Sequence, residues 1–578
     1  MFLATHGLAE YWPEDQELVL LSPGCITAKN KDYCEQRGYQ MVPTLWADLA
    51  WRERASVYML EVQEKMLANL YRVYSNIFNV TISMLEFRAL MASWLDRFVQ
   101  MAYDRFSHVK YALENYDISS INILASKERS APQDENHLIR WLLGDEYTAC
   151  LSGQIALLLQ PTLKTISVER NLPEPQRFSF FSIGKQLVKS WIFRALKFRA
   201  KILHDSMGFN KKESLKLFFM SRGRCQPVAF HAKSENFSVA VPLREKIKLI
   251  NFGQDGFIEI LSRILPWHIP VGLLEGFAIQ YERTKTFYPK IKHVYAANSV
   301  AQNSFQRFFY ARLIKEGRLS YCQHGGGFGI NKYCPDEIIE GKLSHPYCVW
   351  GWANKSNGYQ NLPSPLLSRL LWKCSSNGAD KGVGKFIDAL LVMTNYPRFF
   401  YKNLYAPLGS QMDEYLKDAC FFSRELERFI PGFKVHIREY PVRFDRVFNC
   451  LNGSREELNR LSYSEQMGVS KLVVVDHCMT TFLELLVQNR PMMAYWRSEF
   501  YEVRESARSD LRSLEEVGIY HTSPGRAVNY IRKIWGDLDA WWQSPSVQSA
   551  REAFVQKYAL TSENICGDFL KLAFKKNN

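Results

Sequence analysis

Apolar residues in the C-terminal third of the chain occur in short unbroken runs, separated by segments of helical spacing. Leu472 to Val475 contains no polar side chain, and Pro491 to Trp496 is a second run of this kind. Such runs are typical of central parallel strands that are covered on both faces. Phe482 to Gln488 has helical spacing, so the stretch predicts a strand, a polar loop, a helix and a second strand.

The same alternation continues over residues 385–578 and predicts one α/β domain. Its predicted strands and helices are, in order, Ala389–Thr394, Lys434–Arg438, Leu472–Val475 and Met492–Tyr495, and Leu408–Phe429, Glu456–Met467, Phe482–Gln488 and Ala527–Trp535. A Ser-, Asn- and Gly-rich stretch, Leu367 to Lys385, precedes this series. That composition predicts a linker that acts as a hinge.

Residues 1–375 predict another α/β domain, the first along the chain, so that residues 385–578 are the second. A strand is predicted at Glu17 to Leu21, with another at Met41 to Pro43. Long helical patterns follow at about 51–74 and 85–103, and one strand, helix and strand unit covers 293–322. Residues from about 136 to 216 have mainly helical periodicity and are interpreted as a helical insertion. The predicted fold class is therefore α/β, with two domains.

Composition narrows the class of protein. The chain has 578 residues, of which 47% are hydrophobic, so large cores are expected. The net charge of +14 favours anionic partners, but the basic residues are dispersed and no nucleic-acid recognition motif is present. No apolar run is long enough to span a bilayer, and no signal peptide is evident, which predicts a cytoplasmic protein. Ile183 to Leu203 is apolar and basic, and it is interpreted as a helix packed on the core or lying on an anionic membrane.

The twelve cysteines are scattered without CxxC pairs or a zinc-ligand pattern, so we expect reduced thiols and no structural metal. No Walker loop, zinc-protease motif or Ser/His/Asp triad is present either.

Polar residues gather where the strand Leu472–Val475 ends. Asp476 and His477 follow it directly, and Thr480 and Thr481 stand where the next helix begins. A helix terminus with free N–H groups and hydroxyls attracts phosphate. Glu484, one turn into the helix, is placed to reach ribose hydroxyls. The alternative is that these residues cap the helix and are solvated.

A Gly-rich loop, Gln323 to Gly327, follows the predicted strand at Arg318 to Cys322. Consecutive glycines let a backbone turn sharply and approach a ligand, so Gln323, Gly325 and Gly326 are candidates for phosphate contact. His324 is a candidate acid or base. A structural turn with a hydrogen-bonded histidine is the alternative.

Two further residues end predicted strands of the second domain. Arg438 could make a bidentate contact to a diphosphate, or a salt bridge to a neighbouring carboxylate. Thr394 offers a hydroxyl at the same edge. In the first domain, His268, Glu275 and His345 are interpreted as core or capping residues.

Motifs along nearly the whole chain resemble a family of putative transferases from bacterial O-antigen and surface-polysaccharide clusters. The matching segments are the start FLATHGLAEYW with its later Pro-Gly-Cys, Gln323 to Gly327, Trp350-Gly351-Trp352, Thr394 to Pro397, His436 to Pro441, Asp476-His477 with Thr480-Thr481 and Glu484, and Trp541-Trp542. The pairing of a QHG loop with an Asp and Thr-Thr-x-x-Glu loop is distantly similar to capsule Kdo transferases and CDP-glycerol glycerophosphotransferases.

The resemblance implies a GT-B-like pair of Rossmann-like domains and a metal-independent glycosyltransferase without a cofactor. A nucleotide-sugar donor would bind the second domain, and a glycan or lipid-linked glycan acceptor the first. His324, Asp476 and His477 would share the acid and base roles. Cytoplasmic localisation with peripheral association at the inner membrane is implied for a lipid-linked acceptor.

The chain departs from the family pattern in two places. Met479 stands where a small hydroxyl residue is expected, and VRFDR after Pro441 lacks the expected aromatic and glycine character. These two departures leave the chemical identity of the donor open. Transfer of a polyol phosphate from a CDP-linked donor and a catalytically silent glycan-binding protein remain alternatives.

Overall fold

The computed structural model describes most of the chain. The described residues are 1–79, 82–124, 131–142, 144–173, 197–228, 237–248, 256–288, 290–298, 303–354, 356, 358–376, 387–394, 397–403, 407–408, 411–430, 432–438 and 461–575. The amphipathic segment Ile183 to Leu203 falls largely outside these ranges.

Three parallel sheets organise the described chain. The N-terminal sheet contains β1 (Phe2–Ala4), β2 (Leu18–Leu20), β3 (Gln40–Met41), β4 (Ser120–Leu124) and β5 (Lys164–Val168). The middle sheet contains β6 (Ile202–Asp205), β7 (Cys225–Pro227), β8 (His293–Ala297), β9 (Leu319–Cys322), β10 (Cys348–Val349) and β11 (Gln360–Asn361). The C-terminal sheet contains β12 (Ile387–Thr394), β13 (Phe433–Arg438), β14 (Ser470–Val475), β15 (Met492–Tyr495) and β16 (Tyr520–His521).

Each sheet has a doubly wound strand order. The N-terminal sheet runs β3-β2-β1-β4-β5, which is the order of the Rossmann fold. The other two run β7-β6-β8-β9-β10-β11 and β13-β12-β14-β15-β16, which is the flavodoxin-like order. Ligands of such sheets bind beyond the carboxyl ends of the strands, where the strand order reverses. Those points lie between β1 and β4, β6 and β8, and β12 and β14.

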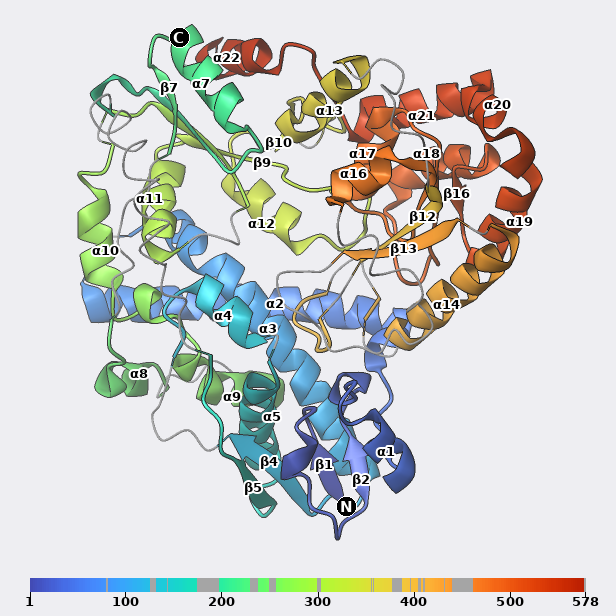
Figure 1. Ribbon diagram of the computed structural model, residues 1–578. Coiled ribbons are helices and arrows are strands. Elements are labelled where there is room, and N and C mark those ends of the chain that lie inside the picture. The colour runs from blue at the N-terminus through green and yellow to red at the C-terminus, as the bar shows by residue number, and fades with distance from the viewer. Residues whose placement is uncertain are drawn as a thin grey trace.

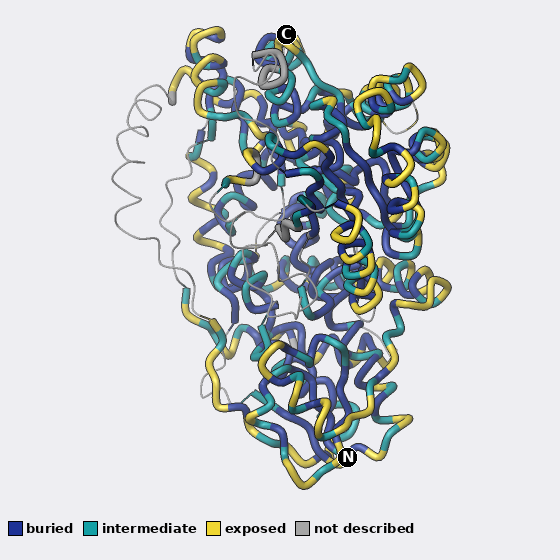
Figure 2. The backbone as a smooth tube through the Cα atoms, turned by 45° about the vertical axis from the view of Figure 1, so that its right-hand side comes forward, coloured by how far each residue is buried: buried dark blue, intermediate teal, exposed yellow. Residues whose placement is uncertain are grey.

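Two long helices, α2 (Leu49–Phe78) and α3 (Met84–Asn115), cross the centre of the molecule, with the N-terminal sheet on one side and the other two sheets beyond them (Figure 1). A capping box between Ser83 and Glu86 starts α3. The helix packs on α2, α5, α11 and α12, so most of its residues are buried. Buried residues run through all three parts of the molecule, and exposed ones lie mainly on the outer helices (Figure 2).

The remaining helices cover the sheets. They are α1 (Lys31–Arg37), α4 (Glu135–Leu142), α5 (Asp145–Leu159), α7 (Lys211–Met220), α8 (Val241–Lys248), α9 (Gly256–Ile264), α10 (Phe277–Thr284), α11 (Ser304–Lys315), α12 (Pro335–Leu343), α13 (Pro365–Ser376), α14 (Gln411–Phe429), α16 (Tyr463–Gly468), α17 (Thr480–Gln488), α18 (Glu505–Glu516), α19 (Pro524–Ile534), α20 (Leu538–Gln543), α21 (Pro545–Tyr558) and α22 (Ile565–Lys575). The last of these, α22, returns to the middle sheet, where Phe569 packs against Tyr295 at 5.2 Å between ring centroids.

The α/β class and the Rossmann-like units are confirmed. Residues 1–375, predicted as one domain, contain two of the three sheets. The helical insertion at 136–216 is not confirmed: that range contains α4, α5 and α7 but also β5 and β6, which belong to two different sheets. Strands of four or five residues are too short to interrupt a helical periodicity in the sequence. The predicted linker also begins as a helix, because residues 365–376 form α13, which packs on α17.

The cysteine expectation needs one correction. Nine cysteines of the described chain are free thiols. Cys420 on α14, however, is disulfide-bonded. Spacing along a sequence does not reveal which cysteines a fold brings together, so that bond could not be predicted.

Residues 397–403, which we call the strap, run from the C-terminal sheet to the N-terminal one. Phe400 stacks on Trp46 with ring centroids 4.2 Å apart. Arg398 donates to the carbonyl of Gly24 at 3.0 Å, and its guanidinium also pairs with Asp145. The strap therefore ties the end of β12 to the first sheet by both apolar packing and charge.

A buried ion cluster links α3 and α4 to α11, the helix between β8 and β9 of the middle sheet. Glu135 on α4 is 2% exposed and accepts a hydrogen bond from Ser93 at 2.8 Å. Its Oε1 also lies 3.0 Å from Arg97 of α3, and its other oxygen pairs with Arg307 of α11. One carboxylate thus holds two buried guanidinium groups from two different helices.

Candidate functional site

The QHGGG loop (Gln323–Gly327) meets the start of α17. The backbone N–H of Gly326 donates to Oγ1 of Thr480 at 2.9 Å. The loop follows β9 of the middle sheet, and α17 follows β14 of the C-terminal sheet. The carboxyl edges of two sheets are therefore joined at the two segments that the sequence singled out.

Gly326 is required for this contact. A Cβ atom at residue 326 would lie 2.5 Å from the carbonyl carbon of Met479 and 2.5 Å from the nitrogen of Thr480. Both are backbone atoms, which cannot rotate away as a side chain can. Glycine lets the two backbones approach, as the sequence argument expected.

Gly326→Ala should separate the loop from α17, because overpacking of this kind costs about 1–3 kcal/mol. We expect lower turnover and faster amide exchange in residues 323–327. Gly256→Ala on α9 is the control, since an added Cβ there would have no heavy atom within 4 Å and the residue lies outside the proposed site. Equal behaviour of the two variants would show that the close approach has no role in turnover.

Gln323 organises the loop from within. Its side chain is buried, its amide donates to the carbonyl of Gly325 at 2.9 Å, and its oxygen accepts from Trp350 N–H and the Trp352 indole at 3.0 and 2.8 Å. Three intramolecular bonds use this amide, so the structure gives Gln323 a positioning role. Direct contact with a nucleotide stays a prediction for this residue and for Gly325.

His324 is held in one orientation and largely enclosed. Its Nδ1 accepts the backbone N–H of Asn298 at 3.3 Å. Burial lowers the pKa of the imidazole to about 4, the Asp336 carboxylate opposes that shift, and Lys402 adds to it. A neutral ring that accepts at Nδ1 carries its proton on Nε2. At neutral pH the His324 ring is neutral in this conformation, and the Asn298 contact favours the tautomer that carries its proton on Nε2, although the Glu340 carboxylate lies 3.8 Å from Nδ1.

Asp476 and His477 form an enclosed pair at the reversal point of the C-terminal sheet. Their side chains are 1% and 2% exposed, and Oδ1 of Asp476 lies 3.1 Å from Nδ1 of His477. Burial raises the pKa of Asp476, while His477 and the Tyr415 hydroxyl lower it. The pair stands directly before α17 but is covered by protein, so its predicted acid and base roles are not tested.

The start of α17 matches the predicted phosphate site in position. Met479 occupies the N-cap and its side chain makes no capping hydrogen bond, so the first turn is not closed by a side chain. The hydroxyl of Thr480 is used by the Gly326 contact, and Thr481 is fully buried. Glu484 is half-buried one turn later. Phosphate and ribose contacts of these residues stay predictions.

Thr394 and Arg438 lie at the same sheet edge. They end β12 and β13 and are paired with each other in the parallel register. Val475, which precedes Asp476, pairs with Val392 on the other side of β12. The backbone thus places both residues near Asp476, as predicted, but their side chains lie outside the described ones.

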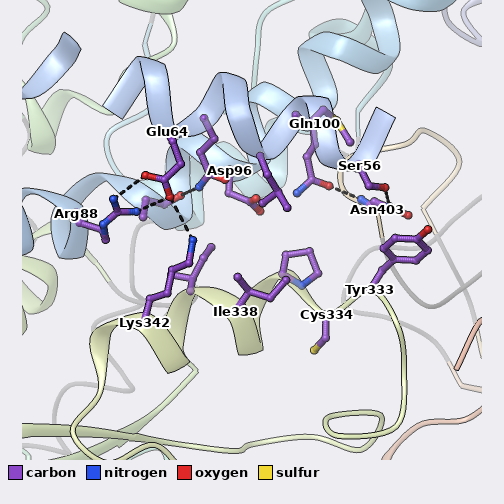
Figure 3. Close-up of a pocket in the computed structure, with 16 residues that line it drawn as sticks. Ser56, Glu64, Arg88, Asp96, Gln100, Tyr333, Cys334, Ile338, Lys342 and Asn403 are labelled. Carbon is purple, nitrogen blue, oxygen red and sulfur yellow. Dashed lines mark hydrogen bonds and ion pairs between the residues drawn. The ribbon is translucent and has the colours of Figure 1, made fainter. Parts of the chain in front are cut away.

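A pocket lies between α2, α3 and α12 (Figure 3). Its walls are mainly apolar. At one end Glu64 binds Arg88 at 2.6 and 2.7 Å and Lys342 at 3.2 Å. At the other end the Asn403 amide of the strap donates to Ser56 at 2.7 Å. We call this cavity the α2/α3/α12 pocket.

Asp96 stands inside this pocket, between its two polar ends (Figure 3). The residue is 5% exposed, and burial raises the pKa of its carboxyl to about 6. The neighbouring Asp336 pairs with Lys402 at 2.9 Å, and both are close enough to His324 to shift its pKa. The pocket and the QHGGG loop therefore share one cluster of charges.

The sequence argument missed Asp96, Asp336 and Lys402. The sequence does carry a signal for Asp96, because Asp96 and Arg97 stand between the apolar pairs Trp94-Leu95 and Phe98-Val99 of a helix, and buried charges need partners. Lys402 carried no signal, since its partner Asp336 is 66 residues away in sequence. His268 and Glu275 are structural as interpreted: His268 binds Tyr147 and Gln154, and Glu275 binds Arg244.

A family model matches residues 1–572, and its description is LIC12162 family transferase. The chain belongs to this family. The QHGGG loop, α17 and the α2/α3/α12 pocket all lie within the matched residues. The protein is therefore a transferase. No curated protein sequence matches the chain.

The chain is also similar to solved protein structures, at low sequence identity and low TM-score. MnaA of S. aureus with UDP has 9% identity and a TM-score of 0.38, over 65% of this chain and 97% of that one. The wall teichoic acid polymerase TagF has 10% identity and a TM-score of 0.31, over 69% and 98%. An α,α-trehalose-phosphate synthase (UDP-forming) from Burkholderia vietnamiensis has 9% identity and a TM-score of 0.33, over 65% and 97%.

Two observations on the described residues concern membranes and metal ions. No helix in that part of the chain has both the length and the apolar composition needed to cross a bilayer. No three His, Cys, Asp or Glu side chains there gather as a metal site. Metal independence stays a prediction.

Proposed function

We propose that this transferase moves a sugar from a nucleotide-activated donor onto a bacterial surface glycan or its carrier. The observation that carries the proposal is the Gly326–Thr480 hydrogen bond, which joins the carboxyl edges of two Rossmann-like units. A substrate held at one edge would reach the other without a large movement. Ligands of parallel α/β sheets bind at that edge.

In this proposal the C-terminal unit holds the donor. The first turn of α17, through the backbone N–H groups of Thr480 and Thr481, faces the phosphates, and Glu484 faces the ribose. Arg438 and Thr394 contribute from the ends of β13 and β12, where a guanidinium can neutralise a leaving diphosphate. Gln323, Gly325 and Gly326 form the opposite wall.

The acceptor side is the α2/α3/α12 pocket. Its apolar walls and polar ends suit a glycan or a lipid-linked glycan better than a small ion. Asp96, with a pKa near 6, is placed to accept a proton from an acceptor hydroxyl there. His324 donates from Nε2 to the departing phosphate or to the sugar. Asp476 and His477 remain candidates for proton transfer on the donor side.

A polyol phosphate from a CDP-linked donor is the alternative reaction, and silent glycan binding is the third. The product separates them. Nucleoside diphosphate, or CMP together with a glycosyl product, supports the proposal. CMP with a new phosphodiester supports the alternative, and no product supports the third. We place the reaction in the cytoplasm, with peripheral association at the inner membrane for a lipid-linked acceptor.

A nucleotide panel tests the donor site. We expect one of CMP, CDP, UDP, GDP and dTDP to raise the thermal stability, since a ligand at about a hundred times its dissociation constant adds about 2.7 kcal/mol. Glu484→Gln should weaken that nucleotide about tenfold, the effect of one lost hydrogen bond to a charged group. Glu505→Gln, an exposed carboxylate on α18, is the control. A panel without any stabilising nucleotide would contradict the donor assignment.

A further inference from the structure

A second pocket lies at the carboxyl edge of the N-terminal sheet. Thr5 follows β1, Ser22 follows β2, and Thr44 is three residues beyond β3, so three strand ends open into it. Arg105 of α3 and Phe400 of the strap complete the wall. This sheet has the Rossmann order and reverses between β1 and β4, where ligands of such sheets bind. The proposed transfer reaction does not use this edge.

The pocket contains buried hydrogen-bond donors without partners. Arg105 is 3% exposed, and its Nη1 donates to the carbonyl of Phe400 at 3.1 Å and pairs with Asp104. Its Nε and Nη2 have no partner, and neither does the hydroxyl of Thr5, which is fully buried. A buried charged donor without a hydrogen-bond acceptor destabilises the protein, because it has lost its contacts with water and gained none in return. The arrangement therefore favours a ligand that brings acceptors.

The acceptors nearby are already used. Asp104 accepts from the Trp46 indole at 2.7 Å and from Arg105, and it faces His108 at 3.3 Å. Asp145 pairs with Arg398. The open donors of Arg105 thus have no carboxylate of the pocket left to bind.

The two open nitrogens of Arg105 form one edge of the guanidinium plane. Nε–H and Nη2–H point in parallel and match the two oxygens of a carboxylate or phosphate. Arg244 shows the same edge in use, since its Nε and Nη2 bind the two oxygens of Glu275 at 2.7 Å each. At Arg244 the protein itself provides the carboxylate, that of Glu275, which occupies this edge of the guanidinium.

We propose that this pocket binds a small oxyanion, the phosphate or carboxylate group of a small metabolite, separately from the transfer site. Arg105 binds two of its oxygens and Thr5 donates to a third. Because the strap forms part of the wall and also reaches the α2/α3/α12 pocket through Asn403, the ligand would hold the strap in place next to the acceptor pocket.

Calorimetry on the full chain tests the proposal with inorganic phosphate and with glucuronate. Binding of phosphate alone identifies a phosphoryl ligand, and binding of glucuronate alone a carboxylate ligand. Arg105→Lys keeps the charge beside Asp104 but loses the paired donors, so we expect the affinity to fall about ten- to a hundredfold. Thr5→Val should lower it as well, and it serves if the lysine variant does not fold.

Arg244→Lys is the matched control. It alters an equally buried arginine whose edge is already occupied by Glu275, so the affinity for either probe should stay as in the unchanged protein. If neither probe binds at millimolar concentration, the proposal is wrong. It is equally wrong if binding persists unchanged in both Arg105→Lys and Thr5→Val, because the ion then lies elsewhere, such as at α17.

Discussion

His324→Ala should lower turnover by about a hundred- to a thousandfold while the affinity for the donor nucleotide changes little. Removal of one donor that stabilises developing charge has an effect of this size. The ring is positioned by the Asn298 N–H, so its Nε2–H points in a fixed direction. Turnover and nucleotide affinity, measured in parallel, check the expectation.

His324→Gln distinguishes a donor from a base. Its side-chain amide can still donate a hydrogen bond but cannot take up a proton. We expect the glutamine variant to keep more activity than the alanine variant if His324 acts as a donor. Equal losses in both would restore the base role, and normal turnover in both would leave His324 as a turn residue.

The pH profile follows from the same geometry. The pKa of His324 is lowered from its ordinary 6.5 to about 4, so the ring is neutral at pH 6 to 8 and gains a proton only as the pH falls toward 4. We therefore expect no transition from this residue near pH 6.5. A transition near pH 6 that disappears in Asp96→Asn would instead identify that carboxyl.

Glu135→Gln should lower the free energy of unfolding by about 3–5 kcal/mol. The change leaves the buried guanidinium groups of Arg97 and Arg307 facing a neutral amide, and breaking a buried ion pair from one side has a cost of this size. Whole domains are stable by only about 5–15 kcal/mol. Urea unfolding followed by tryptophan fluorescence checks the loss.

Glu259→Gln is the control for this substitution. Glu259 pairs with Arg263 on the surface of α9, with side chains 54% and 52% exposed, so the change should cost less than about 1 kcal/mol. Equal midpoints for the two variants would show that the Glu135 cluster does not hold α4 and α11 to α3.

Four of the five strands of the C-terminal sheet were predictable, because they are four to eight residues long and show a strand pattern, whereas the two-residue β16 shows none. Met492 to Tyr495 is a strand with the predicted bounds, and β14 extends the predicted strand by two residues. The meeting of the QHGGG loop and α17 also followed from the sequence, since both come after strands of parallel sheets, whose carboxyl ends carry ligands. That reasoning needs only local patterns and one rule of topology.

Only part of the N-terminal sheet was predictable by the same means. The predicted strand Glu17 to Leu21 contains β2, and the predicted strand Met41 to Pro43 overlaps β3 of that sheet. Its central strand, β1, has three residues, which is too few to show a period, and a strand of this length is recognised only by its neighbours. Both pockets are also formed by residues far apart in sequence. Gln100 receives a hydrogen bond from Asn403, and Arg105 from α3 donates to Phe400. No local pattern carries such pairings.

The strap has a consequence for synthesis on the ribosome. Trp46 is made early, but the ring that covers it, Phe400, is added 354 residues later (400 − 46). At about 5–20 residues per second, that aromatic surface stays uncovered for roughly 20–70 s. A fragment ending at residue 375 lacks Phe400, so the apolar face of Trp46 would stay exposed, and exposed apolar surface favours aggregation. The strap, in the C-terminal half of the chain, therefore completes the packing of the N-terminal half only late in synthesis.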